Sequence, residues 1–135
     1  MENFVPYELA VKLKEKGFKD NCIGYYDYAG KFHYNYKSAI SNKEIYFCHR
    51  KYDNIWHRDL VAAPTISQVL KWLREEKELH IEIYMYHNCY LWEIYNTKIY
   101  DADFSQKSEK YSEIEYATYE IAALAGIKYC LDNLI

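Results

Sequence analysis

Alternation of apolar and polar positions marks residues 79–86 as the clearest strand of the chain. Every second position is apolar: Leu79, Ile81, Ile83 and Met85. The positions between them carry His80, Glu82, Tyr84 and Tyr86. A period of two is typical of a strand that packs one face on the core. Residues 87–89 have turn composition and residues 90–95 resume the strand pattern, which predicts a β-hairpin over residues 79–95.

Residues 22–60 show a comparable pattern, in which aromatic runs are broken by turn residues. The predicted strands are residues 22–26, 31–36, 44–48 and 54–57. Residues with turn chemistry, such as Asp27, Gly30, Asn42 and Asp53, separate them. Consecutive antiparallel hairpins are therefore expected in this part of the chain.

A period near 3.6 predicts a short first helix and a longer second one. In the first, Leu9 and Leu13 share a face, and Gly17 ends the helix so that Phe18 folds back onto its last turn. In the second, Thr65 and Gln68 have the spacing of a capping box. An apolar stripe follows this box, with Trp72 beside it: Ile66, Val69, Leu70 and Leu73.

The C-terminal segment predicts a third helix, over residues 113–133, after a polar loop over residues 101–110. Ser112 and Glu115 repeat the spacing of a capping box. Small residues surround Gly126, so another backbone can approach closely there, either the sheet of this chain or a second copy of the protein. The face that a second copy would cover comprises Ala122, Ala123, Gly126, Ile127, Cys130 and Leu134.

These elements predict a single α+β domain over residues 1–135. We expect a mostly antiparallel sheet with the two main helices packed on one face, together with the short N-terminal helix. The chain has no internal repeat, low-complexity tract or linker of Pro, Gly and Ser. Its 135 residues are about the length of one domain.

Charge and composition argue against several classes of function. The 17 basic and 20 acidic residues are well mixed and leave a net charge of −3, whereas a general nucleic-acid binder needs a positive cluster. The N-terminus lacks the regions of a signal peptide, and no apolar stretch approaches the roughly 18 residues of a membrane span. We therefore expect a cytoplasmic protein without membrane contact, whose cysteines are free thiols in the core: Cys22, Cys48, Cys89 and Cys130.

Five segments of the chain, taken in order, resemble a known group of proteins. They are Lys16-Gly17-Phe18, Cys22-Ile23-Gly24-Tyr25-Tyr26, Ala63-Pro64-Thr65, Trp72-Leu73-Arg74-Glu75 and the closing helix over residues 116–134. This order is similar to that of small proteins encoded by phages, prophages and mobile elements of anaerobic gut bacteria. The resemblance covers most of the chain outside residues 27–60. It implies a shared fold and a mobile-element setting, and it carries over no activity, catalytic residue or cofactor.

Candidate metal ligands and catalytic groups give no recognisable motif. Two groups combine cysteine with histidine, as zinc sites do, but without paired spacing: Cys48-His49 with His57, and His87 with Cys89. The carboxylates of Asp27, Glu82 and Glu93 lie among aromatic residues that can raise a carboxyl pKa, although surface strands carry such residues routinely. We expect no catalytic residue, no metal and no cofactor, and a small enzyme is the least favoured alternative.

Tyrosine is the most informative part of the composition, with 17 residues in the chain. A tyrosine ring buries apolar surface while its hydroxyl forms a hydrogen bond, which suits contact surfaces and base-stacking platforms alike. The predicted interaction surface consists of Tyr84, Tyr86, Trp92 and Tyr95. We expect it to bind an unidentified protein partner, and we expect self-association as a homodimer through the C-terminal helix as one alternative.

Nucleic-acid binding is the main alternative function. The same rings, or those of Phe32, Tyr34 and Tyr36, can stack on bases, and one stretch of the chain is locally basic: Lys37, Lys43, His49, Arg50, Lys51, His57 and Arg58. The rings can equally be packed cross-strand pairs. The net negative charge decides against nucleic acid as the expected partner.

Overall fold

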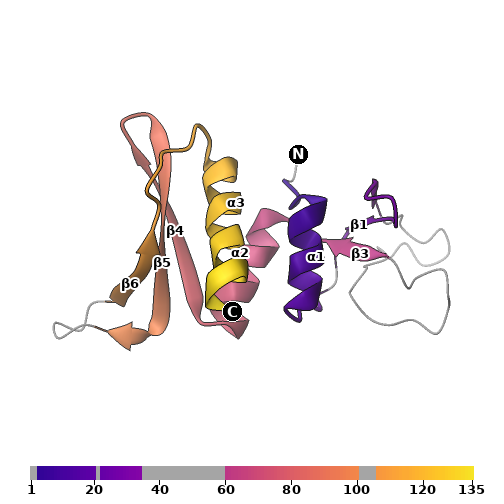
Figure 1. Cartoon of the computed structure of the whole chain (residues 1–135), viewed down its shortest axis with the longest axis horizontal. Coiled ribbons are helices and arrows are strands. Elements are labelled where there is room, and N and C mark those ends of the chain that lie inside the picture. Colours follow the sequence, from indigo (N-terminus) through magenta and orange to yellow (C-terminus); the bar gives the residue numbers. More distant parts are fainter. Residues whose placement is uncertain (1–2, 21, 35–59, 101–105) are drawn as a thin grey trace. The chain divides into compact units, whose positions relative to one another are not determined.

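In the computed structural model, the described residues form two antiparallel three-stranded sheets and the helices that accompany them (Figure 1). The structure describes residues 3–20, 22–34, 60–100 and 106–135. The expected α+β class is confirmed, and the strands form two sheets where one was predicted. The chain divides into two compact units, residues 1–65 and 66–135. The single domain over residues 1–135 stays a prediction.

In the part of it that the structure describes, the first unit contains one helix and one sheet. Its elements are α1 (Tyr7–Glu15), β1 (Gly24–Tyr26), β2 (Phe32–Tyr34) and β3 (Val61–Ala63), with the strand order β2-β1-β3. The hairpin of β1 and β2 was predicted, whereas β3 was not, because all its side chains are buried and its sequence therefore shows no alternation. The predicted strands over residues 44–48 and 54–57 lie outside the described residues.

The end of α1 confirms the predicted glycine cap. Gly17 has a φ of +92°, in the left-handed region that glycine adopts without a steric penalty. The Gly17 N–H donates to the Lys14 carbonyl at 3.2 Å, and the Phe18 N–H donates to the Leu13 carbonyl at 2.9 Å. This pair of bonds is the Schellman motif, and it places the Phe18 ring in the core of the first unit.

A side-chain turn joins β1 to β2. The Asp27 carboxylate accepts hydrogen bonds from the backbone N–H groups of Ala29 and Lys31, both at 2.9 Å. Its second oxygen lies 2.8 Å from Nε2 of His33, and the hydrogen bond from His33 is the main reason that the pKa of Asp27 is lowered. This carboxylate, a catalytic candidate from the sequence, thus holds the hairpin turn.

The second unit consists of a sheet with helices on one face. Its elements are α2 (Ile66–Glu76), β4 (Leu79–Tyr86), β5 (Cys89–Tyr100), β6 (Gln106–Tyr111), α3 (Tyr119–Tyr129) and a final π-helical turn, η2 (Cys130–Leu134). The strand order is β4-β5-β6, so β5 is central. Figure 1 shows α2 and α3 on the same side of this sheet, as predicted for the two main helices.

The hairpin of β4 and β5 confirms the clearest prediction from the sequence and shortens its turn. His87 and Asn88 have φ angles of 48° and 66°, and Tyr86 pairs directly with Cys89. Two consecutive residues with positive φ form the turn whose twist matches that of antiparallel strands. Cys89 therefore belongs to β5 and not to the turn.

The predicted loop over residues 101–110 is wrong for residues 106–110, because they belong to β6. This strand lies at the edge of the sheet, where charged side chains are favoured because they discourage pairing with other chains. Its polar composition therefore resembles that of a loop. Residues 101–105 lie outside the described part of the chain.

The predicted start of the last helix is also wrong. The Ser112 side chain accepts a hydrogen bond from the Trp92 N–H at 3.1 Å, and the Ser112 N–H donates to the Trp92 carbonyl at 2.8 Å. Ser112 thus extends the pairing with β5 and caps no helix. The helix begins at Tyr119 after Thr118, whose hydroxyl accepts from the Ile121 N–H at 3.1 Å as a true N-cap.

Gly126 explains how closely α3 approaches the sheet. A Cβ atom added at this position would lie 3.0 Å from Ile81 Cγ2 and 3.4 Å from Trp92 Cγ. The sequence left two partners open for Gly126, the sheet of this chain and a second copy of the protein. The sheet of this chain is the one that contacts it here. Within the residues described here, no helix has both the length and the apolar character needed to cross a membrane.

Candidate functional site

Three of the four predicted surface residues lie on one face of the second sheet. Direct pairing of antiparallel residues puts their side chains on the same side of the sheet. His80 is opposite Tyr95, and Tyr84 is opposite Leu91. Tyr84 and Tyr86 are two positions apart on β4 and so share a face. Tyr84, Tyr86 and Tyr95 therefore lie together on the face opposite the helices.

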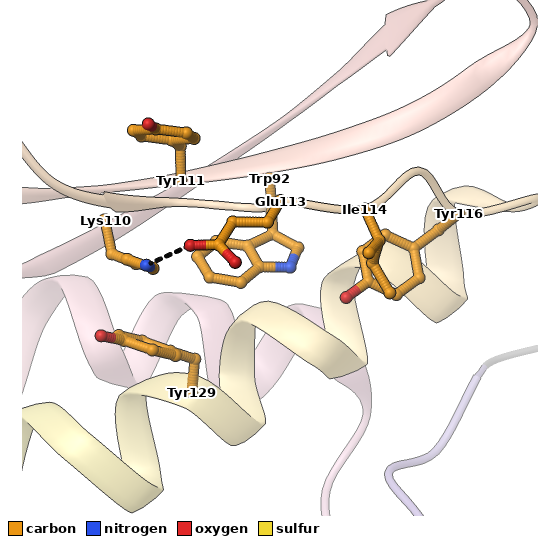
Figure 2. Close-up of a pocket in the computed structure, with 7 residues that line it drawn as sticks. All are labelled: Trp92, Lys110, Tyr111, Glu113, Ile114, Tyr116 and Tyr129. Carbon is orange, nitrogen blue, oxygen red and sulfur yellow. Dashed lines mark hydrogen bonds and ion pairs between the residues drawn. The ribbon is translucent and has the colours of Figure 1, made fainter.

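Tyr111 joins them from the neighbouring strand. It pairs with Glu93 of β5, and Figure 2 shows its ring on the other side of the sheet from Tyr129 of α3. The exposed fractions are 37% for Tyr84, 51% for Tyr86 and 61% for Tyr111. We call the surface formed by Tyr84, Tyr86, Tyr95 and Tyr111 the tyrosine face.

Carboxylates lie among these rings. Glu82 of β4 is directly opposite Glu93 of β5, and like charges in such a cross-strand pair destabilise each other. Nε2 of His80 lies 3.5 Å from Glu82 Oε2. Burial, a hydrogen bond to Glu93 and the negative charges nearby raise the pKa of Tyr95 to about 12. The tyrosine face is thus acidic at its centre.

Trp92, the fourth predicted residue, lies on the opposite face. It pairs with Ile83, is only 5% exposed, and its ring centroid is 5.4 Å from that of Tyr129 on α3. Trp92 and the fully buried Ile94 are two positions apart on β5, so their side chains point to the same face of the sheet. The alternation along residues 90–95 therefore already contained the signal that Trp92 faces the core.

A pocket lies beside Trp92, between the sheet and α3 (Figure 2). Its volume is about 350 Å³, and it is lined by Trp92, Lys110, Tyr111, Glu113, Ile114, Tyr116 and Tyr129. The sequence did not predict this pocket, because residues 101–110 have the composition of a loop and residues 113–133 the pattern of one helix. Only the observed path of β6 and of the irregular segment after it brings these side chains together.

An ion pair lies at one side of the pocket. Lys110 Nζ is 3.0 Å from Glu113 Oε1 and 6.0 Å from the centroid of the Tyr129 ring. The hydrogen bond to Glu113 is the main reason that the pKa of Lys110 is raised, so the amine is held in its charged form. The two opposite charges leave the pocket without net charge.

The indole nitrogen of Trp92 is a buried donor. Among the residues that the structure describes, Trp92 Nε1 has no hydrogen-bond acceptor. A buried polar group without a partner costs about 1–3 kcal/mol, and native proteins contain few of them. An orphaned donor beside a pocket therefore needs an explanation.

Three of the four cysteines lie within the described residues. Cys22, Cys89 and Cys130 form no disulfide there, and burial raises the pKa of Cys130 to about 12. Cys22 and Cys130 are buried as predicted, whereas Cys89 is half-buried. The described ranges contain no group of three or more metal-ligating side chains. Outside those ranges lie Cys48, His49, His57, Tyr36 and the locally basic stretch.

The alternative stacking set in the first unit is largely packed. The Phe32 ring centroid lies 4.7 Å from that of Phe4 and 4.9 Å from that of Tyr34. A Cβ atom at Gly24 would lie 2.6 Å from the Phe32 ring, so Phe32 fills the space that this glycine leaves. These contacts are those of packed rings, and Tyr34 remains half exposed.

Comparisons of the chain with protein families, with curated protein sequences and with solved structures found no match.

Proposed function

We propose that this protein is non-catalytic and acts by binding a protein partner through the tyrosine face, and that the partner presents a basic segment. The observation that carries this proposal is the directly opposed pair of Glu82 and Glu93 among exposed tyrosine rings. The resemblance found in the sequence suggests an accessory role in a phage or mobile element. A homodimer remains a second prediction.

The opposed carboxylates favour a cationic partner. Each destabilises the other in the free protein, and an arginine guanidinium can donate hydrogen bonds to two carboxylates at once. Insertion of such a group would replace a repulsive pair by two attractive ones. His80 offers only one nitrogen to Glu82, at 3.5 Å, so the Glu82 carboxylate can accept further hydrogen bonds.

The rings around these carboxylates favour the same partner. Tyr84 and Tyr86 present partly exposed ring surface, and the face of a tyrosine ring attracts a lysine or arginine cation. Tyrosine is also enriched in protein interfaces, where it supplies a large contact area. Rings and carboxylates together therefore select an arginine-rich or lysine-rich segment.

The same charges disfavour a nucleic acid at this surface. Binding of DNA or RNA draws on cations that neutralise phosphates. Glu82 and Glu93 would repel phosphates from rings that are otherwise able to stack on bases. Base stacking remains the alternative function, and binding of single-stranded oligonucleotides distinguishes it from peptide binding.

The test is selection of random short peptides on the full-length protein, followed by affinity measurements with the selected peptides. We expect the selected sequences to be rich in arginine and lysine. The double substitution Glu82→Gln and Glu93→Gln should weaken their binding at least about tenfold, the effect of losing one strong charge-assisted hydrogen bond. Replacing both Tyr84 and Tyr86 with alanine should also weaken it.

Matched controls separate this site from general attraction to an acidic protein. Glu75→Gln with Glu76→Gln on α2 makes the same charge change at exposed positions and should leave affinity unchanged. Tyr28→Ala removes an exposed ring of the first unit and is the control for the replacement of Tyr84 and Tyr86. Equal losses in both glutamate pairs would refute the proposal. Tight binding of single-stranded oligonucleotides that is lost when Tyr84 and Tyr86 are replaced would favour base stacking instead.

A further inference from the structure

The pocket beside Trp92 is a hollow that opens to solvent, and its volume is about 350 Å³. Ligand pockets range from about 300 to 1,000 Å³. The volume is at the lower end of that range, so it suits a ligand of one or two rings.

The indole N–H of Trp92 gives this pocket a fixed donor. The side chain is 95% buried and the nitrogen has no acceptor among the described residues. Figure 2 shows the nitrogen directed along the pocket toward the side where Ile114 and Tyr116 lie. Ile114 is 62% exposed and belongs to the irregular segment 112–118, so its side chain can shift at little packing cost. A ligand that enters there can offer the missing acceptor.

Aromatic walls define the shape of the ligand. Trp92, Tyr116 and Tyr129 all line the pocket, and the rings of Trp92 and Tyr129 are inclined by 37° to each other. Ring surfaces bind other rings in offset or edge-to-face arrangements. A flat conjugated molecule therefore gains more contact here than an extended or bulky one.

The ion pair defines the charge of the ligand. Lys110 and Glu113 neutralise each other at 3.0 Å, so an anionic ligand such as a phosphate would face Glu113 as well as Lys110. A quaternary ammonium would in turn face the amine of Lys110 over the Tyr129 ring. The pocket therefore favours a neutral molecule.

We propose that this pocket binds a small, neutral, planar heteroaromatic molecule, which accepts a hydrogen bond from the Trp92 indole through a carbonyl oxygen or ring nitrogen. Its ring packs against Tyr116 and Tyr129. The indole of Trp92 lies on the opposite side of β5 from Tyr84, Tyr86 and Tyr95, whereas Tyr111 borders both the pocket and the tyrosine face.

Nuclear magnetic resonance of the full chain tests this directly, because the Trp92 indole N–H gives its own signal. The Trp92→Phe variant assigns that signal by its loss. Uracil and 2-pyridone serve as heteroaromatic probes with a carbonyl acceptor, and benzene serves as a ring of similar size without one. We expect the two heteroaromatic probes to move the indole proton downfield in a saturable way, as a hydrogen bond to an acceptor does, and benzene, which offers no acceptor, to produce no such downfield shift.

Variants then connect binding to the named residues. Trp92→Phe keeps a ring but removes the donor, and it should weaken uracil binding at least about tenfold. Trp72→Phe on α2 makes the same replacement at another buried tryptophan and should leave binding unchanged. If Trp92→Phe does not fold, Tyr129→Leu tests the ring wall, and it too should weaken binding.

Three outcomes would overturn the proposal. The first is an indole signal that none of the probes moves at concentrations up to about 10 mM. The second is an equal response to benzene and uracil, which would mean that the indole donor plays no part. The third is a response to saccharides alone, which would assign the pocket to a different class of ligand.

Discussion

The two faces of the sheet formed by β4, β5 and β6 both carry aromatic rings but place them in opposite environments. On one face, Trp92 packs against α3, where Gly126 leaves room for it. On the other face, Tyr84, Tyr86 and Tyr111 are exposed beside Glu82 and Glu93. The difference arises because successive residues of β5 point to opposite faces of the sheet.

This difference shows that aromatic content alone does not define a binding surface. On the helix-covered face, rings contribute to stability and leave a pocket with a single orphaned donor. On the tyrosine face, rings are partly exposed and two residues of like charge occupy directly opposed positions. We therefore expect substitutions on the covered face to change the free energy of unfolding strongly, and those on the tyrosine face to change it little.

The largest expected contrast is between two apolar residues of β5. Ile94 is fully buried, so Ile94→Ala should lower the free energy of unfolding by about 2–5 kcal/mol. Leu91→Ala, on the half-buried opposite side, should cost only about 1 kcal/mol. Urea denaturation of both variants measures the difference. Similar losses would mean that both faces of the sheet are equally covered.

The second contrast tests the close approach of α3. Gly126→Val places methyl groups where even a Cβ atom meets Ile81 at 3.0 Å, and overpacking of this kind costs about 1–3 kcal/mol. Ala125→Val is the matched control on the next residue of the same helix, and it should cost less than about 1 kcal/mol. Thermal denaturation compares them. A Gly126→Val protein as stable as its control would show that the helix can move away from the sheet.

The third prediction concerns the charges of the tyrosine face. Glu93→Gln removes the charge opposite Glu82 but keeps an acceptor for the Tyr95 hydroxyl. We expect it to raise the free energy of unfolding by about 0.2–1 kcal/mol at low salt, and the gain should shrink at high salt because exposed charges are screened. A double-mutant cycle with Glu82→Gln isolates the pair. A coupling energy of zero or of favourable sign would contradict the repulsion.

The smallest effect is a pH dependence at Tyr95. Its pKa in the folded protein, about 12, lies above the ordinary value of 10.0. A raised pKa means that this hydroxyl stabilises the fold below pH 10 and that its contribution is lost as the pH rises toward 12. The stability of the wild-type protein should therefore fall relative to that of Tyr95→Phe across this window. Urea midpoints of both proteins over the window measure it, and a constant difference would exclude the effect.

Local patterns in the sequence determined much of the secondary structure. The glycine cap at Gly17, the hairpin of β4 and β5 and the stripe of α2 each depend on residues a few positions apart. The period of the side chains and the φ angles that glycine and asparagine tolerate are properties of short segments. These elements and the α+β class were therefore predictable from the sequence.

Partners distant in the sequence decided the rest. The Ser112 side chain bonds to the Trp92 backbone, 20 positions away, so a local capping motif became an extension of the sheet. β6 has the composition of a loop and is a strand only because β5 lies beside it. The pocket needs β5, β6, the segment after β6 and the C-terminal end of α3 in one place. No local pattern encodes such contacts, because they depend on which edge of the sheet is free and on how closely Gly126 lets the helix approach.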